Sequence, residues 1–327
     1  MRGPRFCLFS WLLLCCLLAA PRLEAADAPR PAPAPAPAPP FRLVLERTIG
    51  HYGVGPGEFS SPRGVTLDPL GRILVADTGN HRVERFDSSG VFLGEFGGFG
   101  YDENRFDRPT ALWSMSTLAV WVLDQGNARV VKYDLEGRLI GVVVALRSDD
   151  VRARLDLIEP EGLATDRGGQ LYVTDAAGDR ILLFDPLGAI LTPRGGFGTQ
   201  RGRFDRPTGI AVDDRGRLLV GDAGNRRVQM LDPFGESIAA FPLDSAMTGR
   251  EGLAVAFGPD STWAMADRAT GRLVVCAASG AVLARHVPLA KGDPRAGDLA
   301  FDARGRLLVT DTRANRVVRY RLEAALP

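Results

Sequence analysis

Six residues at one recurring position of the chain could together bind a cation or a polar ligand. They stand at intervals of 43 to 51 residues, each beside the start of a short apolar run, and are Arg63, Thr110, Glu161, Thr208, Glu251 and Gly297. If the runs converge on one axis, two carboxylates, two hydroxyls and a guanidinium meet there. These oxygens suit a hard cation such as calcium, with Glu161 and Glu251 as candidate metal ligands. The same groups could instead bind a polar ligand, or form a solvated mouth in which Arg63 neutralises the acids.

Histidine is scarce in this chain, which has only His51, His81 and His286, none near another in sequence. Zinc sites and acid–base catalysis commonly rely on several histidines. No Ser-His-Asp order occurs, and the Gly-rich segments lack the Lys-Ser/Thr and the helix that a phosphate loop needs. We therefore predict no catalytic residue, and no cofactor apart from the divalent cation considered above. A binding protein is favoured over an enzyme.

The elements that would position these residues are repeats. Residues 97–110 read GGFGYDENRFDRPT, and residues 195–208 read GGFGTQRGRFDRPT, 98 positions later. Both belong to a unit that occurs six times, starting near residues 62, 109, 160, 207, 250 and 296. Each unit consists of short apolar runs separated by Gly-containing turns, and its length suits a four-stranded propeller blade. We predict an all-β, six-bladed β-propeller of antiparallel blades.

The sixth unit ends after its third strand, and residues 41–50, FRLVLERTIG, form an unassigned apolar run before the first unit. We expect this run to supply the missing outer strand and to close the ring, because closure removes exposed sheet edges. Three residues before five of the inner strands stands an apolar residue, expected to fill the space between blades: Phe59, Phe106, Leu157, Phe204 and Met247.

The segments that join one blade to the next are the other candidate binding surface. Residues 98–108 and 196–206 should lie on the same rim as the channel mouth, because antiparallel strands return the chain to that side. The second segment is locally basic, with Arg201, Arg203 and Arg206. We expect these loops to contact a partner.

An Asp is followed five residues later by an Arg in all six units. The pairs are Asp77/Arg82, Asp124/Arg129, Asp175/Arg180, Asp222/Arg227, Asp267/Arg272 and Asp311/Arg316. Six arginines on one rim could form a cationic ring that faces an acidic partner. The alternative is structural, with Asp accepting turn N–H groups and Arg bridging to carboxylates. We favour the structural role, because a feature present in every blade does not single out a site.

These repeats resemble NHL repeats over residues 41–323, with Asn80-His81-Arg82-Val83 closest to the signature. The resemblance implies a six-bladed β-propeller, used commonly for protein contacts, sometimes for RNA and occasionally for catalysis. The Glu161-Gly162 and Glu251-Gly252 dipeptides are also similar to six-bladed metal-dependent lactonases, in which a Glu at this place holds a divalent ion. The alternative to a binding scaffold is thus a metal-dependent hydrolase or a lyase with its site at the channel.

The ends of the chain are expected to lie outside the propeller. Residues 1–28 combine Arg2 and Arg5 with an apolar run of 15 residues, which predicts a signal peptide. Residues 29–40 are rich in Pro and Ala and predict an extended linker, and residues 324–327 form a tail. We expect an extracytoplasmic protein, periplasmic or secreted, without a stable membrane span once the signal is cleaved.

Charge and cysteine content narrow the possible partners. The formal net charge of the full chain is +1, with 40 basic and 39 acidic residues, which provides no electrostatic basis for binding nucleic acid. A protein or an envelope polymer is the expected partner of a monomeric propeller. After removal of the signal only Cys276 remains, so we expect no internal disulfide and a buried, inert thiol.

Overall fold

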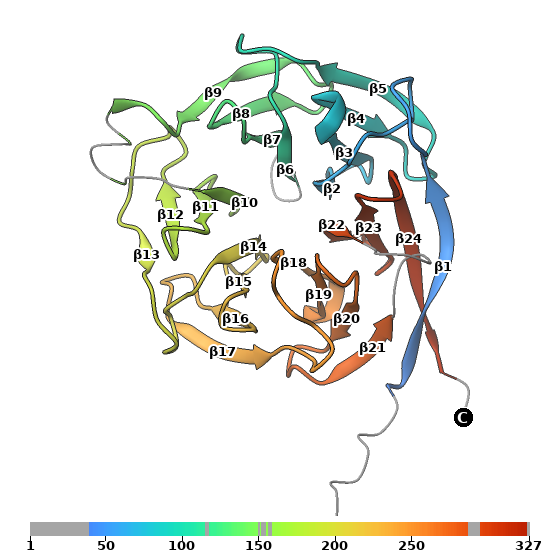
Figure 1. The fold of residues 1–327 in the computed structure, drawn as a ribbon, viewed down its shortest axis with the longest axis vertical. Helices are drawn as coiled ribbons and strands as arrows, with labels where there is room; N and C mark the ends of the chain where they lie inside the picture. The colour runs from blue at the N-terminus through green and yellow to red at the C-terminus, as the bar shows by residue number, and fades with distance from the viewer. Residues whose placement is uncertain are drawn as a thin grey trace, which may run out of the picture. The chain divides into compact units, whose positions relative to one another are not determined.

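The computed structural model describes residues 39–114, 118–149, 151, 155, 159–286 and 295–325. These residues form six four-stranded antiparallel sheets arranged as blades around a central channel (Figure 1). The prediction of an all-β, six-bladed propeller is confirmed. The predicted signal peptide and residues 29–38 of the predicted linker lie outside the described residues, as does Leu157.

The first three blades follow the chain in order, from the innermost strand outward. Blade one contains β2 (Val65–Leu67), β3 (Ile73–Asp77), β4 (Arg82–Phe86) and β5 (Phe92–Gly97). Blade two contains β6 (Pro109–Trp113), β7 (Ala119–Asp124), β8 (Arg129–Asp134) and β9 (Leu139–Ala145). Blade three contains β10 (Pro160–Thr165), β11 (Leu171–Asp175), β12 (Arg180–Phe184) and β13 (Arg194–Gly195).

Blades four and five have the same organisation, and blade six draws on both ends of the domain. Blade four contains β14 (Pro207–Val212), β15 (Leu218–Asp222), β16 (Arg227–Leu231) and β17 (Ser237–Pro242). Blade five contains β18 (Leu253–Phe257), β19 (Trp263–Asp267), β20 (Leu273–Cys276) and β21 (Val282–His286). Blade six contains β22 (Ala296–Phe301), β23 (Leu307–Asp311), β24 (Arg316–Ala324) and, as its outer strand, β1 (Phe41–Ile49).

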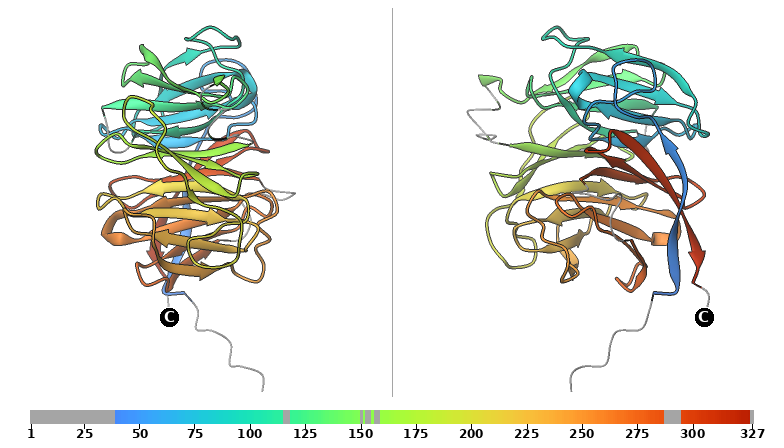
Figure 2. Two further views of the ribbon diagram at one scale, coloured as in Figure 1. Left: turned by 90° about the vertical axis from the view of Figure 1, so that its left-hand side faces the viewer. Right: turned by 45° about the vertical axis from the view of Figure 1, so that its right-hand side comes forward.

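The long strands β1 and β24 lie side by side in all views (Figure 2). Their antiparallel register runs from Phe41 opposite Ala324 to Ile49 opposite Val317, with an irregularity between Leu45 and Arg47. Strand β24 ends at Ala324, one residue beyond the expected limit of the propeller. Two 3₁₀ turns, η1 (Thr78–Asn80) and η2 (Pro259–Ser261), lie in blades one and five. No described helix is long and apolar enough to span a membrane.

The core lies between neighbouring blades, which cover both faces of the inner strands. Strands β3 and β7 are buried at every position, whereas β5 and β17 are only half-buried or exposed. The predicted apolar residues between blades are completely buried for four of the five positions, Phe59, Phe106, Phe204 and Met247. Cys276 is buried in β20, and desolvation raises the pKa of its thiol to about 12, which suppresses the reactive thiolate.

The repeated Gly-Gly-Phe-Gly segments are explained by these buried rings. Gly97 has φ +102°, and a Cβ there would lie 2.3 Å from the ring of Phe106. Gly195 has φ +98°, and its Cβ would lie 2.4 Å from the ring of Phe204. Glycine is therefore required twice over, for the left-handed backbone and for the close approach of the phenyl ring.

Candidate binding site

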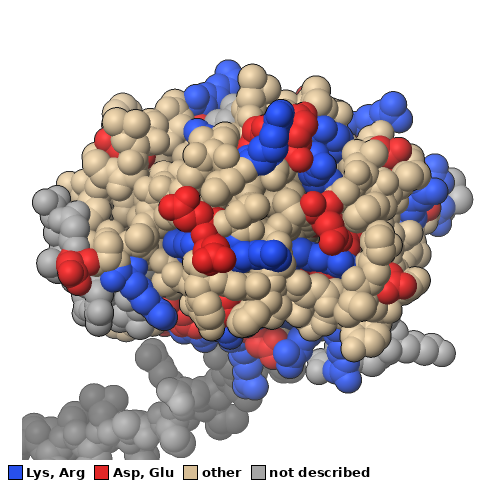
Figure 3. All heavy atoms as spheres, turned by 90° about the horizontal axis from the view of Figure 1, so that it is seen from above, with Lys and Arg blue, Asp and Glu red and all other residues tan. Residues whose placement is uncertain are grey.

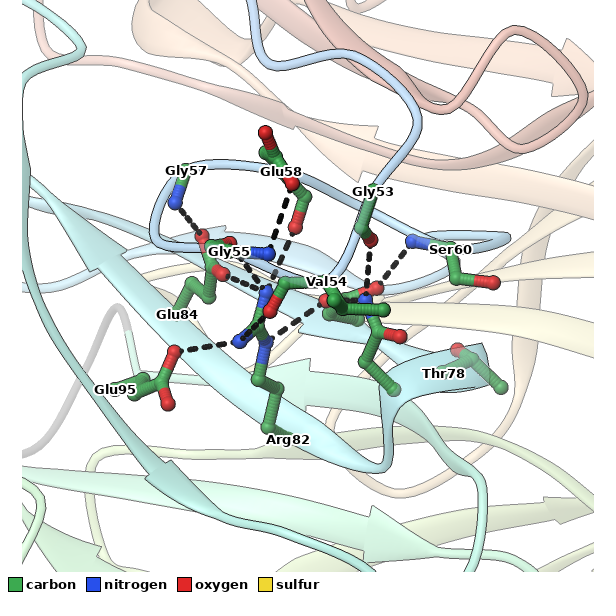
Figure 4. A network of polar contacts seen from close by, with 12 residues as sticks. Gly53, Val54, Gly55, Gly57, Glu58, Ser60, Thr78, Arg82, Glu84 and Glu95 are labelled. Carbon is green, nitrogen blue, oxygen red and sulfur yellow. Dashed lines mark hydrogen bonds and ion pairs between the residues drawn. The ribbon is translucent and has the colours of Figure 1, made fainter.

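In blades one to four the repeated Arg donates hydrogen bonds to the loop through which the chain enters that blade. In blade one, Arg82 Nε lies 3.0 Å from Asp77 Oδ2. Its Nη1 donates to the carbonyl of Val54 at 2.9 Å, and its Nη2 donates to the carbonyls of Gly55 and Glu58 at 2.8 and 2.9 Å (Figure 4). A single buried guanidinium thus fixes the path of the entering loop.

The same contacts recur in other blades. Arg129 pairs with Asp124 and donates to the carbonyls of Tyr101, Asp102 and Arg105; Arg227 pairs with Asp222 and donates to those of Thr199, Gln200 and Arg203. In blade three Arg180 pairs with Asp175 and donates to the carbonyl of Leu155, and in blade six Arg316 pairs with Asp311. These arginines are bound within the protein and do not form a free cationic ring.

Blade five departs from this pattern. Among the described residues, Arg272 forms no ion pair with Asp267. The Asp267 carboxylate instead accepts the backbone N–H of Thr248 at 2.5 Å and of Gly249 at 3.4 Å. The repeated Asp therefore contacts the loop that enters this blade, and Arg226 of blade four donates to the carbonyl of Met247 in the same loop at 2.9 Å.

Five of the six predicted channel residues meet at a cavity of about 270 Å³ in the channel mouth. Its lining includes Arg63, Thr110, Glu161, Glu251 and Gly297, together with Arg268, Arg295, Ala296 and Thr312. The sixth predicted residue, Thr208, does not line this cavity. Its buried hydroxyl accepts the backbone N–H of Leu253 at 2.8 Å and donates to the carbonyl of Leu253 at 3.0 Å, so it joins two blades.

Both candidate metal ligands are paired with arginines. Glu161 Oε2 lies 2.8 Å from Arg268 Nη1, and Glu251 Oε1 lies 3.3 Å from Arg295 Nη2. Glu161 Oε1 also accepts a hydrogen bond from Gln125 Nε2 at 3.4 Å. Within the described part of the chain, no group of three or more His, Cys, Asp or Glu residues could hold a metal ion.

Arg268 is the site residue that sequence reasoning missed. It follows the repeated Asp, at a position occupied in blade order by Thr78, Gln125, Ala176, Ala223, Arg268 and Thr312. Four of these side chains reach the first residues of the next inner strand: Thr78 donates to Pro109, Gln125 to Pro160, Arg268 to Gly297 and Thr312 to Pro62. The sequence did contain an indication of this role, because in the aligned repeats only blade five has a charged residue directly after the repeated Asp.

The charges at the mouth are not balanced one for one. Arg63 is exposed in the cavity and forms no ion pair within the described residues, although Glu161 is near enough to favour its charge. Desolvation in the mouth lowers the pKa of Arg63, and the nearby cations Arg268, Arg108 and Arg295 lower it further. At the entrance of the channel, Arg63 is thus a guanidinium without an ion-pair partner among the described residues.

Below the mouth the channel narrows to a cavity of about 50 Å³ with a mainly apolar lining that includes Val65, Leu163 and Ile210. Asp298 lies at this level, half-buried, and accepts the backbone N–H groups of Leu299 and Val65 at 2.9 and 3.4 Å. Desolvation raises the pKa of Asp298 to about 6, against the opposing effect of Arg268. The channel then widens to a cavity of about 540 Å³ at its opposite end.

The predicted basic loop lies on the rim, and two of its arginines bind their own surroundings. Arg203 donates to the carbonyl of Gly195 at 2.7 Å, and Arg206 donates to that of Arg250 at 3.3 Å. Arg201 is exposed, as are Arg203 and Arg206. Acidic and basic side chains lie next to one another over the side of the molecule seen in Figure 3.

Exposed aromatic side chains mark three of the rim loops. Tyr52, Phe99 and Phe197 are 74%, 59% and 75% exposed. Each forms an isolated parallel bridge with the buried phenylalanine seven residues later, Phe59, Phe106 or Phe204. Tyr101 is also exposed, with its ring 5.8 Å from that of Phe99. Sequence reasoning missed these residues, although the repeated Gly-Gly-Phe-Gly segments contain two of them.

Comparisons with known proteins agree with this architecture. The family model for the NHL repeat matches residues 59–86 and 204–230. "Protein brain tumor" of Drosophila melanogaster is 25% identical over 155 residues, which are 46% of this chain and 14% of that protein. "NHL repeat-containing protein 3" of Homo sapiens is 50% identical over 46 residues, 14% of this chain and 13% of that protein. The chain thus matches only a small part of the length of these relatives.

Solved structures share the fold at low sequence identity. A structure described as streptogramin B lyase has a TM-score of 0.58 and 14% identity, over 86% of this chain and 98% of that one. Virginiamycin B lyase from Staphylococcus aureus has a TM-score of 0.60 and 12% identity, over 88% of this chain and 100% of that one. The chain is thus a six-bladed β-propeller with NHL-repeat matches in blades one and four.

Proposed function

We propose that this protein is an exported, non-catalytic scaffold that binds a protein or an envelope polymer through its rim loops and channel mouth. The observation that carries the proposal is the exposure of aromatic side chains on loops whose backbones are fixed by buried arginines. Tyr101 is exposed while its carbonyl accepts from Arg129. Such a loop loses little conformational entropy on binding, and aromatic residues are enriched among the residues that dominate binding energy.

The binding proposed here requires no cofactor and is assigned to a monomer outside the cytoplasm. Export rests on the signal-like segment 1–28. A metal-dependent hydrolase is a weaker proposal, because Glu161 and Glu251 would each have to give up an arginine partner before they could ligate a cation. The two lyase structures share the fold alone with this chain.

The proposal is tested by comparing partner binding in variants of the two opposite faces of the propeller. A rim variant, Phe99→Ser/Tyr101→Ser/Phe197→Ser, changes three exposed residues of the entering loops. A matched control, Leu187→Ser/Phe234→Ser, changes two exposed residues, 90% and 83% accessible, in turns between third and fourth strands, which lie on the opposite face. A photo-crosslinker replacing Arg201 identifies the partner, and its affinity for purified wild type and variants is then measured.

We expect the rim variant to bind that partner at least about tenfold more weakly while melting at the wild-type temperature. The control should keep both affinity and stability. Loss of affinity in the control, with the rim variant unaffected, would assign binding to the other face and overturn the proposal.

A further inference from the structure

We propose that the channel mouth binds a small organic monocarboxylate, with Arg63 as the receiving cation and the Thr110 hydroxyl as a second donor. The inference rests on the proposed function in one respect only, namely that the channel mouth faces a ligand. It adds the chemical class of that ligand and the residues that recognise it.

Arg63 carries the first part of the argument. The other guanidiniums of the cavity have partners: Arg268 binds Glu161 and the carbonyl of Gly297, and Arg295 binds Glu251. Arg63 lines the same cavity and forms neither an ion pair nor a side-chain hydrogen bond within the described residues. The guanidinium is open to the cavity, and its planar fork of donors matches a carboxylate.

Thr110 provides an independent second observation. It is 7% exposed, lines both the mouth and the narrow section, and its Oγ1 has no hydrogen-bond partner among the described residues. Thr208 occupies the same repeat position in blade four, where its hydroxyl makes two hydrogen bonds to Leu253. A buried hydroxyl that the protein leaves unsatisfied beside a cavity is available to a ligand oxygen.

The remaining lining decides the ligand class. Glu161, Glu251 and Asp298 lie around or just below the cavity, so a dianion such as phosphate would meet three carboxylates. A metal cation would meet Arg63, Arg268 and Arg295. A single negative charge matches the one unpaired guanidinium.

The size and polarity of the channel restrict the ligand further. A volume of about 270 Å³ lies just below the range of small-molecule pockets, which begins at about 300 Å³. The narrow section directly below is mainly apolar and has room for a short alkyl group, about 50 Å³. These features point to a short-chain aliphatic acid.

The test uses propionate as the probe and propionamide as its neutral isostere, titrated into the purified protein at constant ionic strength and followed by protein-observed NMR. We expect saturable propionate binding, with propionamide at least about tenfold weaker. Arg63→Gln should weaken propionate binding by about tenfold or more, and Thr110→Val by a few-fold without a change in melting temperature. Arg304→Gln, which removes an exposed arginine in the turn between β22 and β23, outside the cavity and away from the rim loops, is the matched control and should bind as wild type does.

Equal binding of propionate and propionamide, tighter binding of inorganic phosphate, or unchanged affinity in both Arg63→Gln and Thr110→Val would overturn the inference. Failure here is distinguishable from failure of the rim proposal. The rim variant Phe99→Ser/Tyr101→Ser/Phe197→Ser should still bind propionate, because these three side chains lie outside the cavity. If the protein does not bind propionate but still requires its rim aromatic residues to bind the partner, only the carboxylate inference is overturned and the rim proposal stands.

Discussion

Arg268 of blade five and Glu161 of blade three form an ion pair across the channel mouth, with Nη1 and Oε2 2.8 Å apart. Blade four lies between them in the ring, so the pair links two blades that do not share an interface (Figure 1). Both side chains are mostly buried, 17% and 15% exposed, and Arg268 also donates to the carbonyl of Gly297 in blade six. One guanidinium thus connects three blades.

The ion pair between Arg268 and Glu161 should contribute measurably to the stability of the propeller. Arg268→Gln leaves Glu161 partly desolvated without its partner, and we expect a loss of about 1–3 kcal/mol in the free energy of unfolding. The pair Arg295–Glu251 serves as the control, because its side chains are 51% and 45% exposed. Glu251→Gln should cost less than about 0.5 kcal/mol. Equal losses in the two variants, measured by denaturant unfolding, would contradict a special role for the cross-channel pair.

The two threonines at the same repeat position should respond differently to one substitution. Thr208→Val removes an acceptor and a donor for the backbone of Leu253, and we expect a loss of about 1–3 kcal/mol. Thr110→Val removes a buried hydroxyl that has no partner among the described residues, so stability should be unchanged or slightly higher. Thermal unfolding of both variants checks this. A large loss in Thr110→Val would show that its hydroxyl has a structural partner.

Glu84 in blade one should make stability depend on pH. The carboxylates of Asp77, Glu84 and Glu95 lie 3.0, 2.5 and 2.8 Å from the single guanidinium of Arg82 (Figure 4). Burial raises the pKa of Glu84 to about 8, although Arg82 opposes this shift. The folded protein therefore holds this proton more tightly than the unfolded chain does, whose value is 4.5. Stability from this group is complete below about pH 4.5 and is lost as the pH rises toward about 8.

The variant Glu84→Gln removes this titration. As the pH rises from about 4.5 to about 8, the free energy of unfolding of Glu84→Gln should increase relative to that of wild type by up to about 1.4 kcal/mol per pH unit. A glutamine fits, because Gln229 occupies the same position in blade four, where it accepts from Gly202 and donates to the carbonyl of Arg203. The reciprocal variant Gln229→Glu should acquire the pH dependence. Denaturant unfolding at pH 5 and pH 8 tests both, and parallel stability curves for Glu84→Gln and wild type would rule out the assignment.

Substitution of Gly97 should lower the free energy of unfolding more than substitution of another glycine with positive φ that has free space around it. In Gly97→Ala the new methyl group meets the Phe106 ring, so we expect a loss above about 2 kcal/mol. Gly71 has φ +76°, but a Cβ added there would have nothing within 4 Å, so Gly71→Ala should cost only about 1 kcal/mol. Comparison of their melting temperatures separates the steric cost from the backbone cost.

The repeats made the fold predictable, because six aligned units show which runs are strands and which residues begin them. The same alignment brought Arg63, Thr110, Glu161, Glu251 and Gly297 to one mouth. It could not separate Thr208 from Thr110, since the difference lies in the hydrogen bonds that Leu253 offers in the next blade. The reach of Arg268 past blade four depends on a side-chain conformation that repeat position does not specify.

The rim aromatics illustrate a different limit. Phe197 and Phe204 are the same residue type, seven positions apart, yet one is 75% exposed and the other completely buried. The loop folds back on itself with a parallel bridge between them, and this places one ring inside and the other outside. Hydrophobic periodicity predicts which residues of a strand are buried, but it does not predict which aromatic residue of such a loop is buried and which is exposed.

The seam between β1 and β24 has a mechanical consequence. Phe41 lies opposite Ala324, so the two ends of the folded domain leave the same end of this strand pair. A force applied between these two ends would break the hydrogen bonds between β1 and β24 one residue pair at a time, instead of loading all of them in shear at once. A propeller pulled by its ends should therefore open at blade six under low force, while the other five blades stay folded.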